Sequence, residues 1–154
     1  MKRESFLRLS ISIFLPLLVG FIGSYFTTPA IDSWYFELNK PSFNPPNYLF
    51  APVWTMLYIL MGTSLFLIWE RTREKVYFVI FIAQIFLNST WSILFFAMES
   101  PGIALLNIAL LIVTVIYMIV LFYKKYKIAA YLLIPYLLWI IFAGVLNYSI
   151  WILN

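Results

Sequence analysis

The chain has no cysteine and no histidine among its 154 residues. Without cysteine it forms no disulfide and offers no thiol nucleophile. Without histidine it lacks the commonest metal ligand, the usual proton shuttle and the usual axial ligand of haem. We therefore expect no metal site and no required cofactor.

Charge is also scarce, because only 10% of the residues are charged while 64% are hydrophobic. No carboxylate lies inside a long apolar stretch, and the chain has no paired acids and no Ser/His or Cys/His set. It also lacks a phosphate-binding loop and a dinucleotide fingerprint. The sequence therefore shows none of the residue combinations that conventional acid–base or nucleophilic catalysis uses. Any redox chemistry would have to use tryptophan or tyrosine as electron donor to a bound, light-absorbing ligand.

What the chain does have is long apolar runs. A membrane-spanning helix needs about 20 apolar residues, and five stretches are long enough: 6–26, 51–69, 77–98, 102–123 and 128–152. They are continuously apolar rather than alternating, which argues against a β-barrel. The sequence therefore predicts an all-α fold, in which residues 1–154 form a single domain. That domain is an integral membrane bundle of five transmembrane helices in contact with the lipid bilayer.

Basic residues are distributed unevenly around these stretches. Nine of the ten lie before or at the start of the first stretch, between the second and third, or between the fourth and fifth: Lys2, Arg3, Arg8, Arg71, Arg73, Lys75, Lys124, Lys125 and Lys127. The positive-inside rule then predicts a cytoplasmic N-terminus, with residues 27–50 and the C-terminus outside the cytoplasm. We expect a multi-pass protein of a bacterial cell membrane. Charges confined to short turns do not indicate nucleic-acid binding.

Residues 27–50 form a long loop between the first two stretches. The loop holds four of the eight prolines and six aromatic residues, too many of both for a solvated linker. The pair Thr28-Pro29 is typical of a helix start and predicts a short helix to about Leu38. The prolines that follow favour extended backbone. We expect a structured lid.

Aromatic and amide residues recur at helical spacing in three of the stretches. They are Trp54 and Tyr58 in the second, Gln84, Asn88, Trp91 and Phe95 in the third, and Tyr136, Trp139, Ala143 and Asn147 in the fifth. Three such faces under a lid suit a flat, mostly apolar, aromatic ligand held by a few placed polar groups. A plainer alternative stays open, in which the amides only bond neighbouring helices and Trp54 anchors the membrane interface.

Small residues indicate where helices approach closely. Gly20 and Ser24, four residues apart, predict close packing, either inside the bundle or at a dimer face. Gly62, Ala143 and Gly144 are small enough to leave room for a ligand among the aromatic side chains.

Five ordered motifs cover nearly the whole chain. They are Trp34-Tyr35-x-x-Leu38-x-Lys40-Pro41-Ser42-x-x-Pro45-Pro46, Pro52-Val53-Trp54-x-x-Leu57-Tyr58-x-x-Met61-Gly62, Leu87-Asn88-x-x-Trp91, Pro135-Tyr136-x-x-Trp139-x-x-Phe142-Ala143 and Leu146-Asn147-Tyr148-x-x-Trp151. In these motifs the chain resembles the translocator protein family, also called tryptophan-rich sensory proteins (TspO) or peripheral-type benzodiazepine receptors.

The resemblance implies a five-helix bundle, usually a homodimer, whose cavity is capped by the loop between the first two helices. It also implies binding of porphyrins such as protoporphyrin IX, as ligand or substrate, and of isoquinoline- and benzodiazepine-type ligands. The expected ligand-binding residues are Trp34, Pro41, Pro45, Trp54, Tyr58, Asn88, Trp91, Phe95, Tyr136, Trp139 and Ala143. Trp54 and Trp139 are in addition the candidate catalytic residues, for photochemical electron transfer to the porphyrin.

Two positions depart from the family pattern. Phe43 stands where many relatives have tryptophan, which keeps stacking but removes a hydrogen-bond donor and an easily oxidised ring. Tyr148 is not followed by the Lys or Arg of the sterol-recognition pattern found in animal relatives, so this segment does not support sterol binding.

These observations favour a membrane receptor or sensor that binds porphyrins. Two alternatives remain open: a light- and oxygen-dependent activity that degrades protoporphyrin, and a tetrapyrrole transporter. The sequence does not distinguish among them, although it lacks the intramembrane charges and broken-helix pairs of coupled transporters.

Overall fold

The computed structural model describes residues 3–154, which form helices and connecting turns only. In chain order they are α1 (Arg3–Ile31), α2 (Trp34–Glu37), the 3-10 turn η1 (Asn47–Leu49), α3 (Phe50–Trp69), α4 (Lys75–Ser92), the π-helical turn η2 (Ile93–Ala97), α5 (Pro101–Lys125), α6 (Lys127–Tyr131) and α7 (Ile134–Leu153). The all-α prediction is confirmed.

Five helical segments are long and apolar enough to cross a membrane: Arg3–Ile31, Asn47–Trp69, Lys75–Ala97, Pro101–Lys125 and Lys127–Leu153. The predicted spans agree with them to within a few residues, except that the first helix is longer at its C-terminal end. The chain is therefore a multi-pass membrane protein, and the outward-facing apolar side chains lie in lipid.

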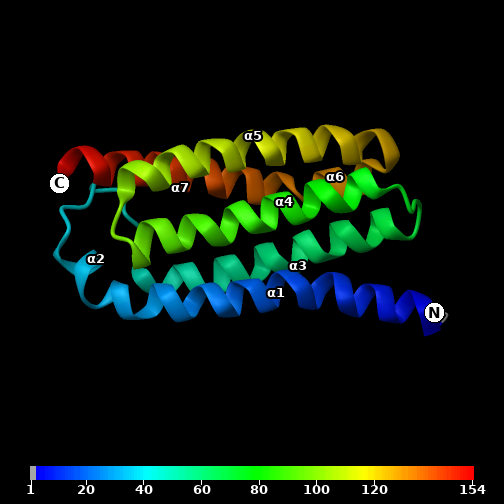
Figure 1. Cartoon of the computed structure of the whole chain (residues 1–154), viewed down its shortest axis with the longest axis horizontal. Helices are drawn as coiled ribbons and strands as arrows, with labels where there is room; N and C mark the ends of the chain where they lie inside the picture. Colours follow the sequence, from blue (N-terminus) through cyan, green and yellow to red (C-terminus); the bar gives the residue numbers. More distant parts are fainter. Residues whose placement is uncertain (1–2) are drawn as a thin grey trace.

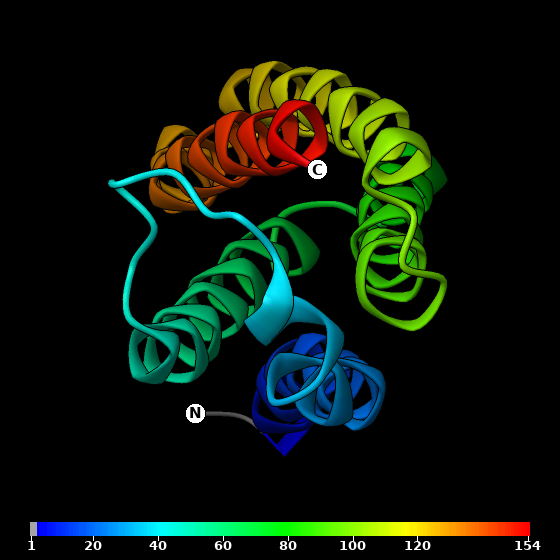
Figure 2. The same cartoon turned by 90° about the vertical axis from the view of Figure 1, so that its left-hand side faces the viewer.

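The five spans lie side by side along one axis (Figure 1) and close into a ring when viewed from one end (Figure 2). Going round the ring, α1 lies between α3 and α4, and α5 lies between α4 and α7. The ring closes between α3 and α7, which contact each other sparsely. The long loop crosses this end of the ring, so the bundle is least tightly packed beneath the loop.

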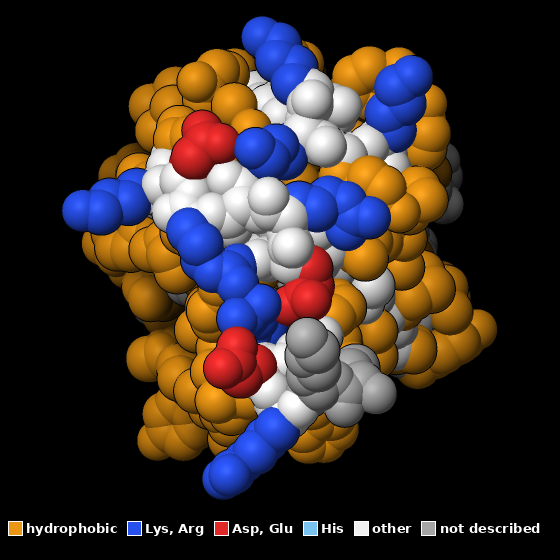
Figure 3. Space-filling model, turned by 90° about the vertical axis from the view of Figure 1, so that its right-hand side faces the viewer, with side chains coloured by type: hydrophobic (Ala, Val, Ile, Leu, Met, Phe, Trp, Pro, Cys, Tyr) orange, Lys and Arg blue, Asp and Glu red, His pale blue; other side chains and the backbone are white. Residues whose placement is uncertain are grey.

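Charged side chains gather at the opposite end of the bundle (Figure 3). Arg8 pairs with Glu70 at 3.0 Å and Lys125 pairs with Glu74 at 3.0 Å. The Arg71 guanidinium lies 3.3 Å from the centroid of the Tyr126 ring. These contacts join the start of α1 to the end of α3, and the α3–α4 turn to the α5–α6 turn. Each is worth little alone, but together they connect all the turns at this end.

The pKa of the Glu74 carboxyl lies below its ordinary value, because Lys125 and Thr72 donate hydrogen bonds to it. The carboxylate therefore stabilises the fold above its unfolded-state pKa, and this contribution is lost as the pH falls through the lower folded-state value.

We expect Lys125→Met to raise the pKa of Glu74 toward the ordinary value, as measured by a carboxyl ¹³C NMR titration. Lys127→Met is the control, since the Lys127 ammonium lies over the Tyr123 ring. An unchanged pKa in Lys125→Met would contradict the ion pair.

The predicted helix start at Thr28-Pro29 is wrong, because α1 continues through Pro29 to Ile31. Proline removes a single backbone bond of the helix, and a chain at the edge of lipid keeps its remaining intrahelical bonds because water does not replace them. The Ser33 hydroxyl donates to the Pro29 carbonyl at 2.8 Å and extends the bonding beyond the last turn. The loop therefore leaves the helix at residue 32 rather than 27, and its own helix α2 is one turn long.

Candidate functional site

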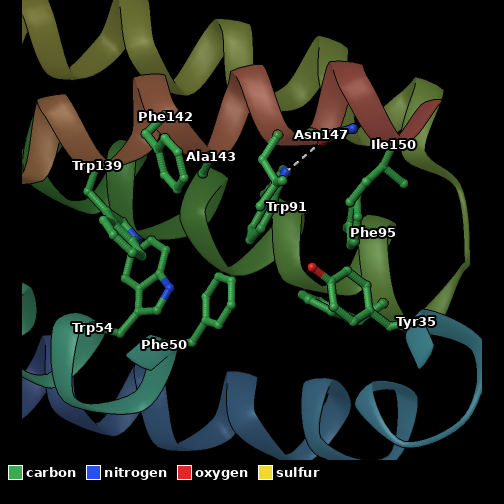
Figure 4. A pocket seen from close by; sticks show the side chains of 12 residues that line it. Tyr35, Phe50, Trp54, Trp91, Phe95, Trp139, Phe142, Ala143, Asn147 and Ile150 are labelled. Atoms are coloured by element: carbon green, nitrogen blue, oxygen red, sulfur yellow. Dashed lines mark hydrogen bonds between the residues drawn. The ribbon is translucent and has the colours of Figure 1, made fainter. Parts of the chain in front are cut away.

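A cavity lies under the long loop, enclosed by α2, α3, the end of α4, η2 and α7 (Figure 4). Twelve side chains line it: Tyr35, Phe50, Trp54, Trp91, Phe95, Phe96, Trp139, Phe142, Ala143, Leu146, Asn147 and Ile150. Eight of the twelve are aromatic and one is an amide. The free space at the centre of the cavity is only about 20 Å³, roughly the room for one water molecule.

The π-helical turn η2 builds one wall of the cavity. It begins two residues after Trp91 and brings both Phe95 and Phe96 to the lining. Trp91 and Phe95 stack with ring centroids 5.5 Å apart and an interplanar angle of 25°, and Phe96 meets Phe95 edge-on at 4.9 Å. Such π turns occur often at functional sites. The wall is a continuous set of ring faces.

On the opposite wall, α3 and α7 contribute two tryptophans. The Trp54 ring stacks on Tyr58 at 5.5 Å and 29°, and its edge meets Tyr136 at 6.3 Å. Trp139 packs edge-to-face against Phe50 at 6.1 Å. Figure 4 shows the two indoles side by side at this end of the cavity. A flat ligand between the two walls would therefore meet aromatic faces on both sides.

Below the cavity, buried polar side chains from three helices form a chain of hydrogen bonds. The Tyr58 hydroxyl donates to Asn88 Oδ1 at 3.1 Å, and Asn88 Nδ2 donates to the Tyr136 hydroxyl at 3.2 Å. The Tyr136 hydroxyl donates to Gln84 Oε1 at 3.0 Å, and Gln84 Nε2 reaches Met61 Sδ at 3.7 Å. We call these five residues the buried network. It joins α3, α4 and α7, as the plainer interpretation of the amides anticipated.

The predicted ligand-binding residues fall into three groups in the structure. Trp54, Trp91, Phe95, Trp139 and Ala143 line the cavity. Tyr58, Asn88 and Tyr136 belong to the buried network instead. Trp34, Pro41 and Pro45 lie in the long loop and are half-buried, with Trp34 packed edge-on against Phe95 at 5.6 Å. The role of all these residues as ligand contacts stays a prediction.

Several lining residues were not predicted as ligand contacts. On α7 the lining residues are Trp139, Phe142, Ala143, Leu146, Asn147 and Ile150. Their spacing follows one helical face, so extending the stripe from Trp139 by i+3 and i+7 would have found Phe142 and Leu146. Phe96 had no such signal, because the π turn shifts the helical register.

Two indole N–H groups of the cavity differ in their bonding. Trp91 Nε1 donates to Asn147 Oδ1 at 3.0 Å, and Asn147 Nδ2 donates in turn to the Pro101 carbonyl at 2.8 Å. Trp139 Nε1 is buried and has no hydrogen-bond partner among residues 3–154. A buried donor without a partner costs about 1–3 kcal/mol. Trp139 therefore lines the cavity with an indole whose hydrogen-bond donor is unused in the ligand-free protein.

The loop closes the cavity with aromatic side chains. The Tyr35 hydroxyl donates to Asn44 Oδ1 at 2.8 Å inside the loop, and burial raises the pKa of this hydroxyl, so it stays neutral. Phe43, the departure from the family pattern, meets Phe142 edge-on at 6.4 Å. A ring at position 43 therefore contacts the cavity wall from the loop side.

Comparison with known proteins identifies the family of the chain. Residues 12–152 match the TspO/MBR family. The chain is 44% identical to the tryptophan-rich protein TspO of Archaeoglobus fulgidus over 153 residues, covering 96% of this chain and 97% of that protein. It is 35% identical to the translocator protein of Homo sapiens over 141 residues, covering 88% and 83%. It is 32% identical to the tryptophan-rich sensory protein of Cereibacter sphaeroides over 146 residues, covering 93% and 92%. The chain therefore belongs to the TspO/MBR family.

Proposed function

We propose that the protein is a membrane receptor or sensor that binds flat aromatic ligands of the porphyrin class in the cavity under the long loop. The observation that carries this proposal is the buried, unpartnered N–H of Trp139 in a cavity lined almost entirely by rings. A ring nitrogen or another acceptor on the ligand would satisfy this donor. The ring faces would supply most of the contact area.

Binding of so large a ligand requires the cavity to open. Ligand sites usually hold about 300–1,000 Å³, whereas the free space here is about 20 Å³. The sparse contact between α3 and α7 marks the side of the ring that can widen most easily. The charged contacts at the other end would keep the bundle together while it does so.

We also propose the orientation that the positive-inside rule predicts. The bases of the α3–α4 and α5–α6 turns would then face the cytoplasm, and the loop would face the opposite side. A ligand would reach the cavity from outside the cytoplasm or from the outer leaflet of the bilayer.

A quantitative test uses protoporphyrin IX without iron and the purified protein in lipid nanodiscs. We expect saturable binding, seen as a shift of the porphyrin absorption band. In Trp139→Phe the dissociation constant should rise about tenfold, because one hydrogen bond is lost. The melting temperature should stay the same or rise, because the substitution also removes an unpartnered donor.

Trp69→Phe is the matched control, since Trp69 packs against Phe78 at 5.6 Å at the charged end of the bundle. It should leave the dissociation constant unchanged. No saturable porphyrin binding by the unaltered protein would overturn the proposed function. Equal affinities of Trp139→Phe and Trp69→Phe would overturn the role of the indole N–H alone.

Light-driven porphyrin breakdown is the second candidate, favoured by two indoles that line one cavity, Trp54 stacked on Tyr58 and Trp139 beside it. An excited porphyrin would take an electron from an indole and pass it to oxygen, which is reduced to superoxide. The indole radical cation would recover an electron from the porphyrin, which is thereby oxidised. Under illumination in air, the porphyrin spectrum should decay several-fold more slowly with Trp54→Phe/Trp139→Phe than with the unaltered protein. Equal decay at matched porphyrin occupancy would exclude the two indoles as donors.

A further inference from the structure

The two halves of the long loop are attached to the bundle unequally. In the first half, the rings of Trp34 and Tyr35 pack against Phe95 with centroids 5.6 and 6.2 Å away. In the second half, residues 38–46, the one aromatic side chain is Phe43, which touches Phe142 edge-on and is 48% exposed. Leu38 also packs against the cluster around Tyr35 and Phe95, so apolar contacts fix the loop firmly as far as Leu38 and hold the rest of the loop segment 38–46 mainly through Phe43.

A reciprocal pair of hydrogen bonds connects this segment to the end of α7. The Asn39 backbone N–H donates to Asn154 Oδ1 at 2.9 Å, and Asn154 Nδ2 donates back to the Asn39 carbonyl at 3.1 Å. We call this pair the amide clasp. Asn154 Nδ2 also donates to the Ile150 carbonyl at 2.8 Å, one of the carbonyls that a helix leaves free at its C-terminal end. That bond fixes the orientation of the Asn154 amide toward the loop.

The amide clasp and one neighbouring bond are the polar connections between the loop segment 38–46 and the bundle. The neighbouring bond is longer, with Asn39 Nδ2 donating to the Leu153 carbonyl at 3.4 Å. Within residues 3–154, the segment's other hydrogen bonds stay inside the loop: Tyr35 to Asn44, Lys40 to Phe36 and Leu38, Asn44 to Pro41, Asn44 to Pro45 and Leu49 to Pro46. Breaking the clasp would therefore free the segment from the end of α7 and leave it held by the Phe43 ring and by the contacts of Leu38, Lys40 and Asn44 with the first half of the loop.

The segment lies over the interface between α3 and α7, which we call the seam of the ring. After the clasp it runs from the end of α7 to the start of α3 (Figure 2), and these two helices contact each other sparsely. Behind this seam lie Trp54 and Phe50 from α3 and Trp139 and Phe142 from α7 (Figure 4). Because the free space is about 20 Å³, a ligand larger than about one water molecule fits only when the lining side chains of α3 and α7 move apart beneath the segment.

We propose that the amide clasp is the latch of the long loop, and that its opening sets how often the seam between α3 and α7 is uncovered. Exposed hydrogen bonds are among the first to open in a native protein, whereas the aromatic packing of α2 keeps the loop attached to the bundle. The latch therefore releases the segment without undocking the first half of the loop. The step in which a ligand enters between α3 and α7 rests on the proposed function. Control of the loop segment 38–46 by the clasp is independent of that function.

Hydrogen exchange in the ligand-free protein tests the latch directly. In Asn154→Ala the Asn44 amide, which donates to the Pro41 carbonyl inside the segment, should exchange about tenfold faster, because two hydrogen bonds of the clasp are lost. Amides of α2 should change much less. Asn39→Ala keeps both backbone bonds of the clasp and loses only the longer one, so it should accelerate exchange by no more than about twofold. Asn47→Ala, at the other end of the loop, is the matched control and should have no effect.

Unchanged exchange of the Asn44 amide in Asn154→Ala would overturn the latch, as would equal acceleration in Asn154→Ala and Asn47→Ala. Melting temperatures of all variants should agree, because Asn154 and Asn47 are exposed. In a second measurement, stopped-flow mixing with protoporphyrin IX should show faster association for Asn154→Ala. Faster exchange without any porphyrin binding would preserve the latch and refute the proposed function instead.

Discussion

Replacing Gly62 with alanine should destabilise the bundle by about 3 kcal/mol or more, near the upper end of overpacking effects. A Cβ atom at Gly62 would lie 2.6 Å from Ile13 Cα and 2.6 Å from the Ser12 carbonyl oxygen. Both are backbone atoms of α1, so no side-chain rotation relieves the clash and α1 must move away from α3. Unfolding in mixed detergent micelles, followed by circular dichroism, measures the loss.

Gly23→Ala supplies the matched control for this prediction. Gly23 lies on the same helix that Gly62 touches, but a Cβ atom there would meet nothing within 4 Å. Alanine is also a better helix former than glycine by about 1 kcal/mol, so Gly23→Ala should be neutral or slightly stabilising. Similar stabilities of Gly62→Ala and Gly23→Ala would show that α1 does not pack on α3 as described.

The glycines also show how far the sequence could predict packing. The spacing of Gly20 and Ser24 predicted a close approach, within the bundle or at a dimer face, and the structure sets Gly20 against the Tyr58 ring inside the bundle. Gly62 was expected to leave room for a ligand, and this was wrong because Gly62 faces α1. Helical spacing reports which residues share a face. It does not report which neighbouring helix that face meets.

The same limit explains which parts of the fold and cavity could be predicted. The five spans followed from the length of the apolar runs, and the α7 stripe of Trp139, Ala143 and Asn147 does face one cavity. Two features could not be read from local sequence. The continuation of α1 through Pro29 depends on the bonds that surround the proline, and the π turn η2 depends on packing of its aromatic side chains.

Asn88 gives the second prediction, because the resemblance implies a ligand contact while the structure puts this amide in the buried network. Asn88→Leu has nearly the same shape but removes the acceptor of the Tyr58 hydroxyl and the donor to the Tyr136 hydroxyl. We expect the free energy of unfolding to fall by about 2 kcal/mol in the absence of any ligand. The polar groups left without a partner are buried within the membrane, where water cannot replace the lost hydrogen bonds. The same detergent titration measures it.

A double-mutant cycle with Tyr136→Phe separates the network from the cavity. Tyr136 donates to Gln84 and accepts from Asn88, so removing its hydroxyl leaves two partners unsatisfied. The loss in Asn88→Leu/Tyr136→Phe should then fall short of the sum of the single losses by about 1 kcal/mol, since residues in one network are not additive. Additive losses would mean that the two side chains act independently. A different outcome would be unchanged stability of Asn88→Leu together with weaker porphyrin binding. It would mean that Asn88 contacts the ligand, and that its amide turns toward the cavity when the ligand binds.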